Sequence, residues 1–225
     1  MDKDLLSIQQ VRDLLKAAKT AQAIYAEFTQ EQVDKVVEAM SMEVRKYAEK
    51  LAKMANEETG FGKWQDKVIK NKFAAEIVYE SIKGMKTIGI LGEKDSVMDV
   101  AVPVGVVAGL IPSTNPTSTV IYKTLISLKA GNGIIISPHP NAKKCIIETV
   151  EILKRAAYGA GAPEGLIGVI EIPTMEATAE LMKHKDTALI LATGGEAMVR
   201  AAYSSGTPAI GVGPGNGPAY IEKTA

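Results

Sequence analysis

The fold is decided by residues 104–137, which read VGVVAGLIPSTNPTSTVIYKTLISLKAGNGIIIS. An apolar run, Val104–Ile111, is followed by a turn that contains two prolines and then by helical periodicity over Thr117–Lys129. A second apolar run, Gly133–Ser137, comes after the helix. Apolar strands joined by a helix are typical of βαβ units, in which a parallel sheet is covered on both faces. We therefore expect these two strands to be parallel neighbours.

The same alternation continues through the C-terminal half of the chain. The further strands that we expect are Val97–Val102, Leu166–Glu171, Ala188–Ala192 and Pro208–Val212, and the further helices are Asn141–Tyr158, Thr174–Lys183 and Glu196–Ser204. Crossovers between parallel strands should be right-handed. The predicted fold class is α/β, with a doubly wound, mainly parallel sheet.

The first ninety residues predict a helical layer. Apolar residues recur at helical spacing from Leu5 to Leu15. Thr29 followed by Gln32 indicates a capping box, and the helix that it opens is expected to continue to Gly60. A third helix is expected over Lys67–Ile82. We expect one α/β domain over residues 1–225, with the helical layer at 1–90 and the βαβ core at 97–225.

The composition excludes several classes of protein. Hydrophobic residues make up 46% of the 225 residues and charged residues 23%, which excludes wholesale disorder. Lys and Arg number 26, as do Asp and Glu, so the formal net charge is zero and we expect no nucleic-acid partner. A single cysteine excludes an intramolecular disulfide and a zinc site built on several thiolates, and we expect no metal site.

The sequence also predicts a cytoplasmic protein that has no membrane partner. No basic region followed by an apolar run stands at the N-terminus. The longest apolar stretch, Val100–Ile111, is interrupted by proline and glycine and is too short to span a bilayer.

Ligands of such sheets bind beyond the carboxyl ends of the strands, so the turns that follow the strands are the candidate sites. Asn115 lies in the first turn and has two interpretations: it caps the next helix, or its amide donates to a developing oxyanion. His139, between Pro138 and Pro140, has three: a general base, a ligand contact or a structural turn.

Two glycine-rich turns follow later strands. Gly194 and Gly195 expose backbone N–H groups at a helix N-terminus, which favours phosphate binding, although a plain tight turn is the alternative. The run Gly211–Pro218 is weak evidence for a nucleotide site, because the following residues, Pro218–Ile221, resemble a strand instead of a helix.

No nucleophile is evident among these residues. Cys145 falls inside the predicted helix Asn141–Tyr158, a placement that favours packing over reactivity. The residues alone thus indicate a cofactor-type α/β domain.

Longer motifs resemble the aldehyde dehydrogenase superfamily, and more narrowly its CoA-acylating branch. They cover nearly the whole chain in order and are Phe28–Asp34, Asp66–Asn71, Val102–Val107, Ile111–Thr119, Ser137–Pro140, Leu191–Gly195 and Ala202–Gly206. That branch oxidises short-chain aldehydes to acyl-CoA with NAD. A cysteine thiolate adds to the aldehyde, a hydride is transferred to NAD, and CoA attacks the thioester.

The resemblance implies roles for individual residues. Asn115 matches the side-chain donor to the oxyanion. Thr193, Gly194 and Gly195 match the turn at the dinucleotide pyrophosphate. The other positions that the resemblance assigns to cofactor binding are Ile111, Pro112, Ser137, Pro138, His139, Pro140, Met198, Val212 and Gly213.

Two departures from the hydrolytic members are informative. Where those members carry a Lys and a Glu for the ribose, Ser137 and Pro140 stand here, which leaves NAD and NADP both open. Where they carry a glutamate that activates water, Val212 stands here. Since valine is no base, coenzyme A is the implied acceptor.

The family's nucleophilic cysteine is expected about 20 residues beyond Ala225 by the resemblance, so we expect this chain to be an inactive N-terminal fragment. A small aldehyde, coenzyme A and further copies of the chain are the implied partners, and a bacterial microcompartment is a possible location. The alternatives are a hydrolytic aldehyde dehydrogenase and a non-catalytic assembly module of the same fold.

Overall fold

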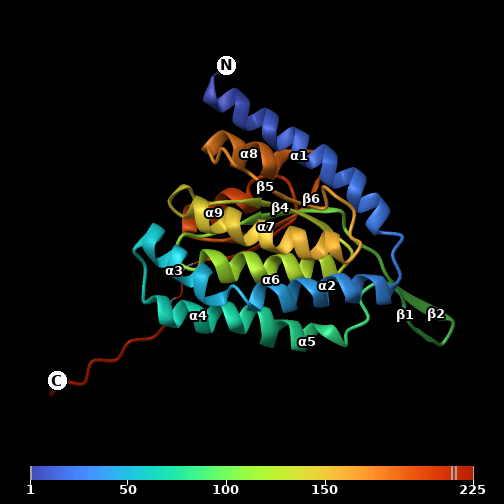
Figure 1. The fold of residues 1–225 in the computed structure, drawn as a ribbon, viewed down its shortest axis with the longest axis horizontal. Helices are drawn as coiled ribbons and strands as arrows, with labels where there is room; N and C mark the ends of the chain where they lie inside the picture. The colour runs from blue at the N-terminus through green and yellow to red at the C-terminus, as the bar shows by residue number, and fades with distance from the viewer. Residues whose placement is uncertain (1, 214, 216, 225) are drawn as a thin grey trace.

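The computed structural model describes residues 2–213, 215 and 217–224. Its centre is a parallel sheet of five strands in the order β5-β4-β3-β6-β7 (Figure 1). The bounds of these strands are Val106–Leu110 (β3), Gly133–Ser137 (β4), Ile167–Val169 (β5), Thr187–Thr193 (β6) and Ala209–Val212 (β7). The α/β fold class and the parallel pairing of the strands on either side of residues 117–129 are confirmed.

Helices cover both faces of the sheet. One face packs against α1 (Lys3–Tyr25), α8 (Met175–Lys183) and α9 (Glu196–Tyr203). The other packs against α6 (Pro116–Lys129) and α7 (Lys143–Gly159), and α2 (Gln30–Arg45) forms a further layer outside them. The sheet is therefore doubly wound, as expected.

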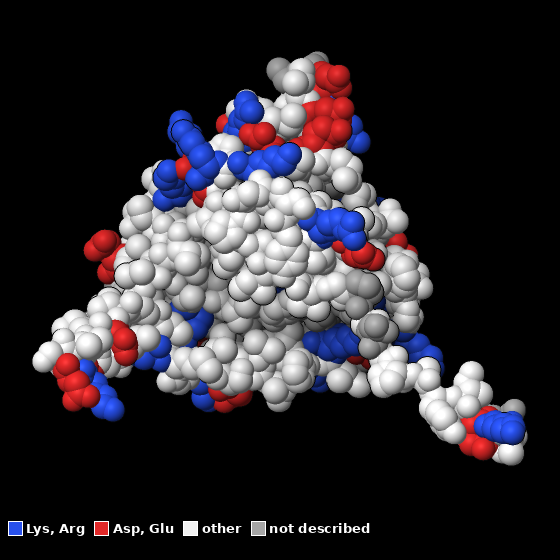
Figure 2. Space-filling model, turned by 180° about the vertical axis from the view of Figure 1, so that it is seen from behind, with Lys and Arg blue, Asp and Glu red and all other residues white. Residues whose placement is uncertain are grey.

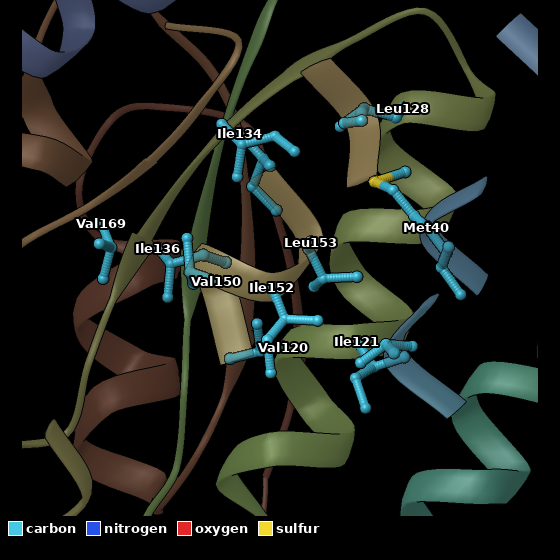
Figure 3. Close-up of a cluster of buried hydrophobic side chains, with 14 of the residues drawn as sticks. Met40, Val120, Ile121, Leu128, Ile134, Ile136, Val150, Ile152, Leu153 and Val169 are labelled. Carbon is cyan, nitrogen blue, oxygen red and sulfur yellow. The ribbon is translucent and has the colours of Figure 1, made fainter. Parts of the chain in front are cut away.

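Strand β4 shows why the sheet is buried on both sides. Successive side chains of a strand point to opposite faces. Ile134 and Ile136 join the cluster formed with α6 and α7, which Figure 3 shows, whereas Ile135 joins the cluster formed with α1 and α8. All three are fully buried. A run of β-branched residues without polar alternation is the pattern that such a strand requires.

The helices of the N-terminal layer are interrupted at places where the sequence predicts continuous helices. The helix expected from Thr29 to Gly60 is two helices, α2 and α3 (Ala48–Thr59), separated by a tight turn at Lys46 and Tyr47. The apolar pattern runs through the break because both helices bury their faces against α7. The capping box of Thr29 and the left-handed Gly60 at the end of α3 are confirmed.

The third helix also differs from the expected Lys67–Ile82. It begins as α4 (Trp64–Lys72), passes through a π-helical segment, Phe73–Val78, and ends as α5 (Tyr79–Lys83). In the π segment the carbonyl oxygen of Ala75 accepts a hydrogen bond from the Ser41 hydroxyl (2.7 Å). Side chains of α2 thus satisfy a carbonyl group in the segment that leaves α-helical geometry.

The strand expected at Val97–Val102 lies outside the parallel sheet. It is β2 (Val97–Ala101), which pairs antiparallel with β1 (Gly89–Lys94), a strand that the sequence did not indicate. Asp95 and Ser96 make the turn with positive φ angles, as a two-residue hairpin turn requires. The hairpin projects from the body, and residues 217–224 extend from another corner (Figure 1).

The surface mixes charges of both signs. Figure 2 shows lysine, arginine and acidic residues interspersed along the margins of one face, with a broad central area that carries few of them. Within the described ranges, no helix combines the length and the apolar character that crossing a bilayer requires.

Candidate functional site

The turns singled out from the sequence meet at one edge of the sheet. Leu110, the last residue of β3, pairs with Ser137 of β4 and with Ala192 of β6, and Thr193 pairs with Val212 of β7. The strand ends are therefore level with each other. Ligand sites of open parallel sheets form at this edge, where the strand order changes direction, and here that point lies between β3 and β6.

Lys123 of α6 lies between the ends of β3 and β6, where the strand order changes direction. Its Nζ donates to the carbonyl oxygens of Leu110 and Leu191, each at 2.7 Å, and so joins β3 to β6. The side chain is 1% exposed. Desolvation lowers the pKa of Lys123 to about 7. Sequence reasoning missed this residue, although a lysine among the apolar residues of a buried helix was the available signal.

Helix α4 holds the turn between β3 and α6. Lys67 donates from Nζ to the carbonyl oxygen of Thr114 (2.7 Å), and Thr117 donates from its hydroxyl to Oδ1 of Asn71 (2.7 Å). Asn71 is itself fixed, because its Nδ2 donates to the carbonyl oxygen of Ala48 (3.0 Å). Burial, and next the neighbouring Lys70, lower the pKa of Lys67.

Asn115 occupies the N-cap position of α6, but its side chain makes no capping hydrogen bond. Its Oδ1 instead accepts a hydrogen bond from Lys70 Nζ (2.8 Å). Pro116 at the first helical position has no N–H, so the first turn of α6 has one unpaired donor fewer. Within the described part of the chain, Nδ2 of Asn115 has no acceptor. Asn115 therefore stands at the N-cap without capping through its side chain, and a half-buried amide donor remains available at the edge of the sheet.

The turn Thr193–Gly195 leads into α9. Gly195 is the N-cap, and a Cβ atom placed on it would meet nothing within 4 Å. The N–H groups of Met198 and Val199 bond to the carbonyl oxygen of Gly195. The N–H groups before them lie in the unpaired first turn of a helix, where a phosphate group fits. Glu196, also in this turn, pairs with Arg200 (3.0 Å) on the exposed side.

The segment after β4 offers less to a ligand. Ser137 is 4% exposed, and its hydroxyl bonds to that of Thr178 (3.0 Å). Pro138 is buried too, whereas His139 and Pro140 are exposed. His139 Nδ1 accepts the N–H of Asn141 (3.1 Å), which stabilises the turn. Of the interpretations of His139, the structural turn is therefore observed.

The remaining predicted positions lie beside these turns. Ile111 is buried, Pro112 and Met198 are half-buried, and Val212 and Gly213 are exposed at the end of β7. In the glycine-rich run, residues 214 and 216 lie outside the described residues. Pro218–Ile221, which resembles a strand in sequence, has no regular structure, because no strand pairs with it within the described ranges.

Cys145 is placed as a packing residue. Its side chain is fully buried, and Sγ contacts the carbonyl oxygen of Ala142 (3.3 Å). Burial, and next the carboxylate of Glu58, raise the pKa of the thiol. Glu58 accepts the N–H groups of Lys144 (2.7 Å) and Cys145 (2.8 Å) and so caps α7 from α3. A thiol held in this protonated state is a poor nucleophile.

The sequence model of the aldehyde dehydrogenase family matches residues 5–213. The chain belongs to the aldehyde dehydrogenase family. The edge at which Asn115, Gly194 and Gly195 meet is thus the carboxyl edge of an aldehyde dehydrogenase sheet.

Known relatives narrow the comparison within the aldehyde dehydrogenases. The chain is 50% identical over 221 residues to the bifunctional aldehyde-alcohol dehydrogenase AdhE of Escherichia coli, covering 97% of this chain and 25% of that protein. The structure of an acetylating aldehyde dehydrogenase from Geobacillus thermoglucosidasius is 58% identical, with a TM-score of 0.95, over 100% of this chain and 50% of that one. That of a probable aldehyde dehydrogenase from Listeria monocytogenes is 65% identical, also with a TM-score of 0.95, over 97% and 49%. The chain therefore spans about a quarter to a half of the length of these relatives.

Proposed function

We propose that this chain is the cofactor-binding part of a CoA-acylating aldehyde dehydrogenase, which reversibly converts a short-chain aldehyde to acyl-CoA with NAD. The observation that carries the proposal is the amide of Asn115. Its oxygen is occupied by Lys70 and its Nδ2 is available, at the edge where the cofactor turns meet. A preorganised donor at this place suits an oxyanion that develops when a thiolate adds to an aldehyde.

Each part of the edge contributes a different function. Asn115 donates to the aldehyde oxygen, and the N–H groups of Glu196 and Ala197 at the start of α9 hold the pyrophosphate of the dinucleotide, since the N–H of Gly194 already bonds to the carbonyl oxygen of Val212 (3.4 Å). Lys123 keeps the ends of β3 and β6 at a fixed separation beneath the site. The bound nicotinamide supplies the hydride acceptor. The nucleophilic thiolate comes from outside these 225 residues in this proposal, because Cys145 is buried and protonated.

Coenzyme A is the acyl acceptor in this proposal. Val212 is 62% exposed at the position where the resemblance puts the water-activating glutamate of hydrolytic members. An isopropyl group cannot remove a proton from water, so attack by water is slow and a thiol takes the acyl group. In support, the structure of a propionaldehyde dehydrogenase from Rhodopseudomonas palustris, 32% identical with a TM-score of 0.79, holds CoA and an acylated cysteine.

We propose NAD as the redox cofactor, and NADP also fits the ribose end. No carboxylate stands at Ser137–Pro140 to repel a 2′-phosphate. An engineered glycolyl-CoA reductase, 32% identical with a TM-score of 0.81, has bound NADP⁺.

We further propose that the protein is a cytoplasmic homo-oligomer whose contacts include the β1–β2 hairpin. Val97 (63% exposed) and Val100 (52%) are apolar, and the strand edges offer unpaired backbone groups. A microcompartment is a second possible location, because a 33% identical propionaldehyde dehydrogenase comes from one in Clostridium phytofermentans.

The experiment that tests the activity compares acyl acceptors in the complete enzyme. Acetaldehyde and NAD are supplied with and without coenzyme A, and acyl-CoA, free acid and NADH are measured. We expect NADH to form in step with acyl-CoA and only slowly without CoA. Free acid released as fast as acyl-CoA would establish the hydrolytic alternative. Titration of the 225-residue chain with NADH, followed by fluorescence, separates these enzymes from an assembly module, which would give no saturable signal.

A further inference from the structure

Three side chains on one face of α4 hold the segment that carries Asn115. Lys67, Lys70 and Asn71 stand at positions i, i+3 and i+4, which share a face of a helix. They contact residues 114, 115 and 117 in that order. Lys67 is 6% exposed and Asn71 is 1% exposed, so two of the three side chains are buried. The turn is thus held against a helix of the N-terminal layer.

The contact of Lys70 decides how the Asn115 amide is oriented. An ammonium group has donors only, so the atom 2.8 Å from Nζ must be the carboxamide oxygen. Because the oxygen is bonded to α4, the Nδ2 donors are left for another acceptor.

The charge of Lys70 acts on this amide directly. Among the described residues, no carboxylate lies within ion-pairing distance of its ammonium group. A cation on the carbonyl oxygen draws electron density from the amide nitrogen and strengthens its N–H donors.

We propose that Lys70 is a positioning residue for the oxyanion donor: it holds the Asn115 carboxamide with Nδ2 toward the reacting oxygen and places a positive charge behind it. The proposal rests on the proposed function, in which Asn115 donates to that oxygen. Because negative charge grows on the oxygen only as the thiolate adds, Lys70 acts on kcat more than on KM.

The test is a double-mutant cycle in the complete enzyme, with coenzyme A and acetaldehyde saturating. We expect Asn115→Ala to lower kcat by about 10²–10³-fold. Lys70→Met lowers kcat by about tenfold through misorientation of the amide, with KM changed less than about twofold, and Lys70→Arg recovers most of the rate. In the Asn115→Ala background, Lys70→Met has an effect of less than about twofold, because its target is gone.

A matched control and four outcomes make the test decisive. Lys72→Met removes another exposed lysine of α4 that contacts no residue of the turn, and it leaves kcat unchanged.

A Lys70→Met effect of equal size with and without Asn115 would overturn the positioning role. Wild-type kcat for Lys70→Met beside an inactive Asn115→Ala would do the same while leaving the proposed function intact. Full activity of Asn115→Ala would overturn both the positioning role of Lys70 and the proposed function. If Lys70→Met does not fold, Lys70→Gln is measured in its place, because glutamine retains a hydrogen-bond donor without the charge. A wild-type kcat for Lys70→Gln would overturn the role that the proposal gives to the positive charge.

Discussion

The Nζ atom of Lys123 lies 2.7 Å from the carbonyl oxygen of Leu191, and the same atom bonds to β3 at the place where the strand order changes direction. This buried amine has a pKa lowered to about 7 by desolvation. In the unfolded chain the amine has its ordinary pKa of 10.5. Between these two values the unfolded chain binds a proton that the folded chain does not.

The stability of the wild-type chain relative to Lys123→Met should therefore rise with pH. The free energy of unfolding increases with pH wherever the unfolded state binds more protons, by up to about 1.4 kcal/mol per pH unit for one group. Near pH 9 we expect the variant to be less stable by about 1–3 kcal/mol, because two buried carbonyl oxygens lose their donor. The difference narrows as the pH falls toward 7. Urea unfolding of both chains at several pH values measures this, and a difference that is constant with pH would contradict it.

Gly211 and Gly213 provide a matched pair for the packing of β7 on α9. A Cβ atom on Gly211 would lie 2.7 Å from Cγ1 of Val199, whereas one on Gly213 would meet nothing within 4 Å. We expect Gly211→Ala to destabilise the chain by about 1–3 kcal/mol through overpacking. Gly213→Ala should change stability by less than about 0.5 kcal/mol. Equal unfolding midpoints for the two variants would show that α9 yields to the added methyl group.

Gly195→Ala separates cofactor binding from folding. The added methyl group meets no protein atom within 4 Å, so the thermal midpoint should stay within about 2 °C of wild type. It stands where a pyrophosphate would approach the N-terminus of α9, and we expect NADH affinity to fall by about tenfold, equivalent to about 1.4 kcal/mol. Fluorescence titration of the wild type and of Gly195→Ala with NADH measures the two affinities. Unchanged affinity would place the pyrophosphate elsewhere.

The carboxylate of Glu58 should contribute measurably to stability as a cap supplied from another helix. Glu58→Ala leaves the N–H groups of Lys144 and Cys145 without their acceptor, and we expect a loss of about 1–2 kcal/mol in chemical denaturation. The adjacent Glu57→Ala is the control, because Glu57 is exposed and outside this contact. A loss of the same size in both variants would argue for a general charge effect.

Cys145 should be unreactive until the chain unfolds. Its thiol is fully buried and its pKa is raised by burial. We expect a disulfide reagent to leave the native chain unlabelled over the time in which it labels the denatured chain completely. Rapid labelling of the native chain would indicate that the N-terminal end of α7 opens locally.

The sequence predicted most of the fold because the decisive elements carry local signals. Strand β4 is a β-branched run without polar residues, and α2 begins at a complete capping box. Strand β1 escaped prediction because its sequence, GILGEK, contains two glycines and one β-branched residue, whereas β2 carries two valines. The break between α2 and α3 was missed because one apolar periodicity runs through both helices.

The site was predictable only at the level of its turns. Asn115, Gly194 and Gly195 follow strands in the sequence, and parallel register brings strand ends together. The partners of the supporting lysines were not predictable, although the place of Lys123 in a buried helix was a signal. Lys70 and Lys123 act across 45 and 68 residues of sequence, on Asn115 and Leu191 respectively, and no periodicity encodes such contacts.

The contacts of α4 with residues 114, 115 and 117 make the N-terminal layer part of the support of the Asn115 side chain. In chimaeras between relatives, exchange of residues 1–90 alone would transplant Lys67, Lys70 and Asn71 beneath a foreign turn. Small differences in how that turn meets the helix would be transmitted directly to Asn115. Productive crossover points should therefore lie outside the stretch from α4 to α6, which recombination must inherit as a single block.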